Sequence, residues 1–283
     1  MVHLLQKWDG VYTRIRGRRM MLFFDFDGTL APIASKPGYA RIPDVTLSLL
    51  KEVLRLRSCK LAVVSGRALA DIKKKIGLKG IVYVGNHGLQ IRGAGVRYTA
   101  PLVPGYKASL RKIKARIARG IRRYSGALIE DKGLSLSVHY RLVSSRDCAA
   151  LRMAVRKIAQ PYCARRLIRV RTGKMVMEIR PDFRWDKGSA VRWLIGKWRA
   201  LDKGARTVAL CCGDDSTDED AFRALAGKGI TVVVGRRAES AAQYFLDTQD
   251  EVNGLLRRII TGARQTLWIP FNRQRNRSGS TRV

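Results

Sequence analysis

Short apolar runs alternate with segments of helical spacing over the first hundred residues. Residues 20–26, 60–64 and 81–84 are apolar runs that each lead into polar residues or glycine, as buried strands do where a loop begins. Between them, residues 43–57 and 68–76 carry apolar side chains spaced as on one face of a helix. Strands and helices in alternation predict a parallel sheet with crossover helices.

The pattern changes after about Pro104, where two successive units of helix, strand and strand follow. Their elements cover residues 106–124, 127–130, 134–140, 145–160, 167–171 and 175–180. This repetition predicts a small α+β unit with its helices on one face of an antiparallel sheet. The alternating α/β pattern then resumes, with elements over residues 187–198, 207–212, 217–225 and 231–234.

This order of elements predicts a doubly wound parallel α/β core into which a smaller α+β cap is inserted. We expect residues 1–103 and 184–269 to form the core and residues 104–183 the cap. The cap would lie above the carboxyl ends of the core strands, where open α/β sheets bind ligands. Residues 270–283 contain four arginines and no acidic residue, so we expect a disordered tail.

The composition carries no sign of a membrane span or a secretion signal. No stretch approaches the ~18 consecutive apolar residues of a membrane helix, and residues 1–19 hold no apolar run of signal-peptide length. The five cysteines are odd in number, and Cys211 and Cys212 are adjacent in a predicted strand, which argues against a disulfide framework. We therefore expect a cytoplasmic monomer with no membrane partner.

The chain is strongly basic, because 56 lysines and arginines against 22 acidic residues give a formal net charge of +34. Such a charge attracts nucleic acid, a membrane surface or an anionic substrate. The basic residues are spread over the predicted helices, however, and no RNA-binding signature, helix-turn-helix or zinc-finger spacing is present. This spread of basic residues favours a generally basic host proteome as the cause of the net charge. Nucleic-acid binding stays open as the alternative.

Two carboxylates follow the first predicted strand directly, in the segment DFDGT at residues 25–29. Both project from a strand end, where Gly28 permits a tight turn. A calcium loop is the structural alternative, but a loop that begins at Asp25 needs glycine at its sixth position and glutamate at its twelfth. Those positions hold Leu30 and Lys36, which excludes the calcium loop.

Polar residues also occur at the ends of later core segments. Ser65 follows the second strand, Lys187 opens a helix, and Asp214, Asp215 and Asp218 follow the strand over residues 207–212. Each is weak evidence alone, because a serine after a strand is more often a helix cap and a lysine at a helix start is more often solvated. Their joint order along the chain indicates a functional site at the ends of the core strands.

The strings DFDGT, VVSGR, RPDFRWDKG and GDDSTDED resemble the four motifs of the haloacid dehalogenase superfamily of phosphohydrolases, in that superfamily's order. The insertion between the second and third strings is similar to the superfamily's large cap. A narrower resemblance is to the trehalose-6-phosphate phosphatases, through the strings GNHG, EDKG, HYR, EIRP and GDDSTDEDAF. The resemblance covers about residues 20–260, and no catalytic motif is missing.

The resemblance implies a magnesium-dependent phosphatase that hydrolyses trehalose 6-phosphate through an aspartyl-phosphate intermediate. A phosphate monoester dianion resists attack by another anion, so the site must supply positive charge. By the resemblance, Mg²⁺ would be held by Asp25, the backbone carbonyl of Asp27 and Asp214, with Asp218 and Asp215 supporting them.

The same resemblance implies the catalytic roles. Asp25 would attack phosphorus, while Asp27 would protonate the leaving sugar oxygen and then take a proton from the hydrolytic water. Lys187 would add a second positive charge. Ser65 and the backbone amides after Asp27 would hold the phosphoryl oxygens in line.

Substrate contacts are implied for Arg67, Asn86, His87, Gly88, Glu130, Lys132, Arg141 and Glu178. Carboxylates accept hydrogen bonds from pairs of sugar hydroxyls, while lysine and arginine donate them. Alternation along the predicted cap strands can place several of these side chains on one face, toward the core. Exposed strand salt bridges are the structural alternative for the cap residues, and a satisfied core histidine is the alternative for His87.

Two other functions remain open. A related phosphatase of sucrose phosphate or mannosyl-phosphoglycerate would use the same chemistry, although the EDKG and HYR strings argue against it. A basic nucleic-acid-binding protein with a secondary phosphatase core is opposed by the complete catalytic set. Because 283 residues leave no room for a fused trehalose-6-phosphate synthase, we expect any synthase partner to be a separate chain.

Overall fold

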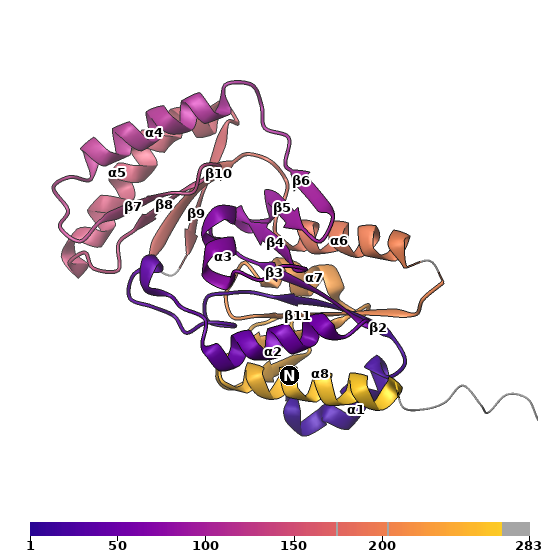
Figure 1. Ribbon diagram of the computed structural model, residues 1–283. Coiled ribbons are helices and arrows are strands. Elements are labelled where there is room, and N and C mark those ends of the chain that lie inside the picture. The colour runs from indigo at the N-terminus through magenta and orange to yellow at the C-terminus, as the bar shows by residue number, and fades with distance from the viewer. Residues whose placement is uncertain (174, 203, 268–283) are drawn as a thin grey trace, which may run out of the picture.

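The computed structural model describes residues 1–173, 175–202 and 204–267, and it contains two β-sheets (Figure 1). The main sheet has nine strands in the order β1-β13-β12-β11-β2-β3-β4-β5-β6. In that order, they cover Val2–His3, Tyr244–Leu246, Ile230–Val234, Thr207–Gly213, Arg19–Phe24, Cys59–Val64, Val82–Gly85, Gln90–Gly93 and Val96–Thr99. Neighbouring strands are parallel from β1 to β4, and β5 and β6 add an antiparallel hairpin at one edge.

Strand β2 lies at the centre of the main sheet and is buried on both faces. Met20, Leu22 and Phe24 join one apolar cluster and Met21 and Phe23 the other, because successive strand side chains point to opposite faces. The first face is covered by α1 (Trp8–Ile15), α2 (Asp44–Arg55), α3 (Leu69–Ile76) and α8 (Glu251–Leu267). The second is covered by α6 (Lys187–Leu201) and α7 (Glu219–Leu225). Short 3₁₀ helices cover Leu5–Lys7, Pro37–Tyr39 and Asn86–Gly88.

Between β6 and α6 the chain forms a second layered unit, which we call the cap. Helices α4 (Tyr106–Gly120) and α5 (Ser145–Ala164) pack on one face of a four-stranded antiparallel sheet in the order β7-β8-β10-β9. These strands cover Leu128–Asp131, Leu136–His139, Val176–Pro181 and Ile168–Gly173. Figure 1 shows both helices on the side of this sheet away from the main domain. The predicted fold class is confirmed, while the cap boundaries at residues 104 and 183 stay predictions.

The predicted elements omit α1, α8, the edge strands β1 and β13 and the β5-β6 hairpin. Helix α8 nevertheless buries Val252, Leu255, Leu256 and Ile259, which have the spacing of one helix face. Helix α5 continues to Ala164, past its predicted end and past Pro161. Proline removes one backbone hydrogen bond from a helix, and the buried packing of α5 on the cap sheet compensates for that loss.

Other expectations bear on the cysteines, the membrane and the tail. All five cysteines are free thiols, as predicted. Within the part of the chain that the structure describes, no helix is long and apolar enough to cross a membrane. The predicted tail, residues 270–283, lies outside the described residues.

Candidate active site

The aspartates that follow β2 and β11 meet at the carboxyl edge of the main sheet. These strands are parallel neighbours, and the backbone N–H of Asp25 donates to the carbonyl of Cys212 at 2.9 Å. From β2 the chain builds the sheet outward through β3 and β4, and it later returns to add β11 on the other side of β2. Such a reversal of strand order leaves a crevice at the strand ends, and Asp25 and Asp214 lie there.

A tight turn after Asp25 brings the backbone against Asp214. The N–H of Gly28 donates to the carbonyl of Ala31 at 2.7 Å, and Gly28 has a φ of 83°. L side chains rarely adopt this conformation, and a Cβ at position 28 would lie 2.2 Å from Asp214 Oδ2. Glycine is therefore required both by the turn and by the neighbouring carboxylate.

Lys187 lies between two of the acidic side chains and is only 2% exposed. Its Nζ donates to Asp25 Oδ1 and to Asp218 Oδ1, both at 2.8 Å. Asp186 caps helix α6 by accepting the backbone N–H of Ser189 at 2.7 Å, which places Lys187 in the first turn. Burial opposes the lysine charge, but Asp218 and Asp25 hold the pKa of Lys187 well above its ordinary value.

Asp25, Asp214 and Asp218 form an acidic cluster in which one carboxylate oxygen of each lies within 4.8 Å of the others. Burial, together with the neighbouring aspartate charges, raises the pKa of Asp25 and of Asp214 to about 8. Asp214 Oδ1 is buried and has no hydrogen-bond partner among the described residues. Mutually repelling carboxylates with an unpaired buried oxygen fit a divalent cation, which prefers oxygen ligands.

The turn after β3 places Ser65 and Arg67 beside these aspartates. Ser65 is 1% exposed, and its Oγ accepts the backbone N–H of Arg67 at 3.2 Å. The Arg67 guanidinium donates from Nε and Nη2 to the two oxygens of Asp27, at 2.7 and 2.6 Å, and from Nη1 to Asp71 at 2.8 Å. Arg67 therefore engages the second aspartate of the DFDGT segment directly.

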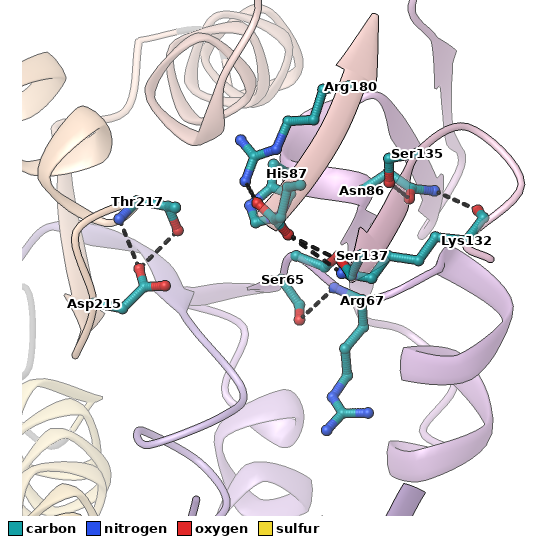
Figure 2. A network of polar contacts seen from close by, with 12 residues as sticks. Ser65, Arg67, Asn86, His87, Lys132, Ser135, Ser137, Arg180, Asp215 and Thr217 are labelled. Carbon is teal, nitrogen blue, oxygen red and sulfur yellow. Dashed lines mark hydrogen bonds and ion pairs between the residues drawn. The ribbon is translucent and has the colours of Figure 1, made fainter. Parts of the chain in front are cut away.

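Side chains of the cap reach across to the main domain in the network that Figure 2 shows. Glu178 Oε1 lies 2.8 Å from His87 Nε2 and 3.4 Å from Lys132 Nζ, and Glu178 Oε2 contacts Arg180. Lys132 Nζ also donates to the carbonyl of Gly66 at 3.0 Å. Burial opposes the charge of Glu178, but the hydrogen bond with His87 and the charges of Arg180 and Lys132 hold its pKa well below the ordinary value. Glu178 is therefore ionised where it faces the core.

His87 and Gly66 pack so closely that position 66 has no space for a side chain. A Cβ at Gly66 would lie 2.3 Å from the His87 ring. Burial, reinforced by Arg180, lowers the pKa of His87 to about 4, so its ring is neutral near pH 7. The His87 ring thus lies at the junction of cap and core, against Glu178.

Asn86 is fully buried and is committed to the cap loop. Its Oδ1 accepts the hydroxyl of Ser135 at 2.9 Å, and its Nδ2 donates to the carbonyl of Lys132 at 3.2 Å and to Gln90 at 3.1 Å. These bonds satisfy the amide without a ligand. Asn86 thereby ties the end of β4 to the loop between β7 and β8.

A cavity of about 770 Å³ lies between the strand ends of the main sheet and the cap. Eleven of the predicted site residues line it: Asp25, Asp27, Ser65, Arg67, His87, Glu130, Lys132, Arg141, Glu178, Lys187 and Asp214. Its described lining does not include Asn86, Gly88 or Asp218. The carbonyl of Gly88 accepts the indole N–H of Trp185 at 2.8 Å, and Asp218 accepts a hydrogen bond from Lys187.

Residues 23–250 match the family model described as trehalose-phosphatase. The chain belongs to the trehalose-phosphatase family. It is 34% identical over 263 residues to a trehalose-phosphate phosphatase of Mycobacterium leprae, which covers 88% of this chain and 59% of that protein. The chain thus spans less than two thirds of that relative's length.

Two solved structures extend the likeness in fold. The C-terminal domain of the Candida albicans trehalose-6-phosphate phosphatase superposes with a TM-score of 0.76 at 22% identity, covering 92% of this chain and 98% of that domain. A haloacid dehalogenase-like hydrolase from Bacteroides thetaiotaomicron superposes with a TM-score of 0.62 at 16% identity, covering 86% and 100%. The chain therefore has the haloacid dehalogenase fold with a cap.

The cavity lining also includes residues outside the predicted site set, among them Arg180, His139 and Arg237. Arg180 contacts Glu178, and alternation along β10 could have placed both on one face. His139 Nε2 lies 2.8 Å from Glu130 Oε2, across the β7-β8 pair. Arg237 contacts the backbone carbonyl of Asp214, and its only signal in the sequence is its position after the strand β12.

Proposed function

We propose that this protein hydrolyses trehalose 6-phosphate to trehalose and inorganic phosphate. The observation that carries the proposal is one cavity with two chemically different sides. Asp25, Lys187 and Asp214 on the core side suit phosphoryl transfer, while Glu130 and Glu178 on the cap side suit sugar hydroxyls. The volume of about 770 Å³ is within the usual range of small-molecule sites.

The acidic cluster supports a bound divalent cation, which the family resemblance gives as Mg²⁺. Asp25 and Asp214, with the backbone carbonyl of Asp27, would hold it, and Asp218 would support them through Lys187. Such a cation neutralises charge on a transferring phosphoryl group when it is bound. Its charge would also oppose the burial and the neighbouring aspartate charges that raise the pKa of Asp25 and of Asp214.

Residues of this chain account for each bond and proton change of the proposed reaction. A carboxylate oxygen of Asp25 attacks phosphorus, the bond from phosphorus to the sugar oxygen breaks, and Asp27 gives its proton to that oxygen. Water then attacks the aspartyl phosphate, Asp27 takes a proton from the water, and Asp25 is released with inorganic phosphate. Lys187, at 2.8 Å from Asp25, holds the nucleophile and adds positive charge.

The cap residues support recognition of the sugar that carries no phosphate. Glu130 and Glu178 accept hydrogen bonds, Lys132 and Arg141 donate them, and all four line the cavity. In the structure, Lys132 pairs with Glu130 and Glu178 and also bonds to the carbonyl of Gly66 on the main domain. Sugar hydroxyls would replace those bonds, so binding is coupled to movement of the cap.

The test is phosphate release from trehalose 6-phosphate, glucose 6-phosphate and sucrose 6-phosphate, each with magnesium and with chelator. We expect trehalose 6-phosphate to have the highest kcat/KM by at least about tenfold, because only it offers both glucose rings to the cap. A higher kcat/KM on sucrose 6-phosphate would make the protein a sucrose phosphatase. A retardation assay with RNA over a salt series tests the nucleic-acid alternative, because backbone binding weakens steeply with salt.

A further inference from the structure

We infer that Arg67 is a positioning residue that fixes the Asp27 carboxylate for proton transfer, and that Asp71 fixes Arg67. The inference rests on the proposed function, because it takes Asp27 as the group that exchanges a proton with the leaving oxygen and with water. It replaces the implied role of Arg67 as a substrate contact.

The contact between Arg67 and Asp27 is a two-point contact. Nε donates to Asp27 Oδ2 at 2.7 Å and Nη2 donates to Asp27 Oδ1 at 2.6 Å. Two parallel N–H···O bonds from a planar guanidinium fix the distance and the plane of a carboxylate, which a single bond does not. An ionised carboxylate offers about four lone-pair sites, so roughly half of them stay free for a proton or for substrate.

Arg67 is itself held from two further directions. Its Nη1 donates to Asp71 Oδ2 at 2.8 Å, and its guanidinium carbon lies 5.3 Å from the centre of the Phe26 ring. The Arg67 side chain is 7% exposed, whereas those of Asp27 and Asp71 are 37% and 36% exposed. The rigid partner of the pair is therefore the arginine, and the exposed part of Asp27 faces the cavity that it lines.

Positive charge alone does not explain an arginine at this position. Lys187 already supplies charge at the nucleophile, at 2.8 Å from Asp25. A sugar contact does not explain it either, because three of the five guanidinium N–H groups of Arg67 are occupied by Asp27 and Asp71. What the arginine adds is the orientation of one carboxylate, two residues along the chain from the nucleophile.

Leaving-group chemistry separates this role from a structural one. A sugar alkoxide is a poor leaving group and needs a proton from Asp27, whereas 4-nitrophenolate leaves without one. We would compare single-turnover rates on trehalose 6-phosphate, phenyl phosphate and 4-nitrophenyl phosphate, with enzyme in excess and magnesium present. The variants are Arg67→Lys, Arg67→Gln and Asp71→Asn. The matched control is Arg19→Gln, which breaks an arginine–aspartate pair of 2.6 Å at Asp202, outside the cavity lining.

We expect both Arg67 variants to lose at least about 30-fold on trehalose 6-phosphate and less than about threefold on 4-nitrophenyl phosphate, with phenyl phosphate between them. In multiple turnovers of 4-nitrophenyl phosphate, one equivalent of nitrophenolate should appear rapidly, followed by slow release, because attack by water also needs Asp27. Asp71→Asn should change the rates in the same direction by a smaller factor, and Arg19→Gln should leave all three rates unchanged.

Three results would overturn the inference. Equal losses of rate on the three esters would give Arg67 a structural role. A raised KM, with kcat and its dependence on the leaving group unchanged, would make Arg67 a substrate contact. The third is a loss on 4-nitrophenyl phosphate larger than that on trehalose 6-phosphate. If wild type hydrolyses the aryl esters but not trehalose 6-phosphate, the proposed substrate fails, and the inference is still decided by the two aryl esters. A wild type inactive on all esters would overturn both proposals.

Discussion

Lys132 on the cap donates a hydrogen bond from Nζ to the backbone carbonyl of Gly66 on the main domain, at 3.0 Å. The same ammonium lies 3.4 Å from Glu178 and 3.9 Å from Glu130. Side chains that suit the sugar therefore also hold the cap against the main domain. Under the proposed function, sugar hydroxyls would replace these contacts, so we expect recognition of the sugar to be coupled to movement of the cap.

Glu130→Ala should lower kcat/KM on trehalose 6-phosphate by at least about tenfold, since hydrogen bonds to a charged partner contribute ~1.5–3 kcal/mol. Activity on 4-nitrophenyl phosphate should change far less, because that ester has no second sugar. Steady-state kinetics on the two substrates measure the contrast. No loss on either ester would make Glu130 a solvated strand residue.

Glu178→Ala should also lose more activity on trehalose 6-phosphate than on 4-nitrophenyl phosphate. It should in addition lower the stability of the fold, which Glu130→Ala should not. Glu178 is 13% exposed and contacts Arg180, Lys132 and His87, so its removal leaves buried cations unpaired. Urea unfolding of the two variants measures this difference. Equal losses on both esters would assign Glu178 to cap closure alone.

Asp25→Asn should abolish turnover on every ester while the protein stays folded, because a neutral amide does not attack phosphorus. Residual turnover above about a hundredth of wild type would exclude Asp25 as the nucleophile. The variant also removes a charge that raises the pKa of the buried Lys187. Circular dichroism and thermal unfolding with magnesium confirm that the fold is retained.

Activity should vanish in chelator and return when magnesium is added. Calcium should support turnover poorly, because it is larger and takes a more variable number of oxygen ligands than the octahedral magnesium ion. Asp214→Asn should weaken the binding of magnesium. The magnesium concentration that gives half-maximal rate should therefore rise. Full activity in chelator would contradict the proposed chemistry.

His87 should make stability depend on pH between about 6.5 and 4. Burial and Arg180 lower the pKa of His87 to about 4 in the folded protein, against an ordinary value of 6.5. The unfolded chain therefore binds the extra proton across this window, so stability falls as pH falls through it and levels off below about 4. The loss is on the order of 3 kcal/mol.

Urea unfolding at about pH 7 and about pH 5 should show about 2 kcal/mol of this loss in wild type, and His87→Gln is compared over the same interval. The variant should lose less stability over the interval, because it lacks the titrating ring while its carboxylates are those of the wild type. Equal losses in the two proteins would show that His87 is not the group responsible.

Much of the fold was readable from local patterns. The apolar run at residues 20–24 forms the central strand β2 because a strand buried on both faces needs apolar side chains at every position. The ends of parallel strands share one edge of a sheet, so Asp25, Ser65 and Asp214 could be placed together from their order alone. The apolar residues at 252, 255, 256 and 259 have equally regular helical spacing, although α8 is not among the predicted elements.

The sequence by itself determined the strand-end aspartates, the inserted cap and the residue types that surround the cavity. Only the tertiary structure decided the partners: Arg67 with Asp27, Asn86 with Ser135, and Glu178 with His87. Each of these pairs joins residues from different elements, two of them across the junction of cap and core. Hydrophobic periodicity reports which face of an element is buried, whereas a hydrogen-bond partner depends on how two elements are seated and on which rotamer their packing allows.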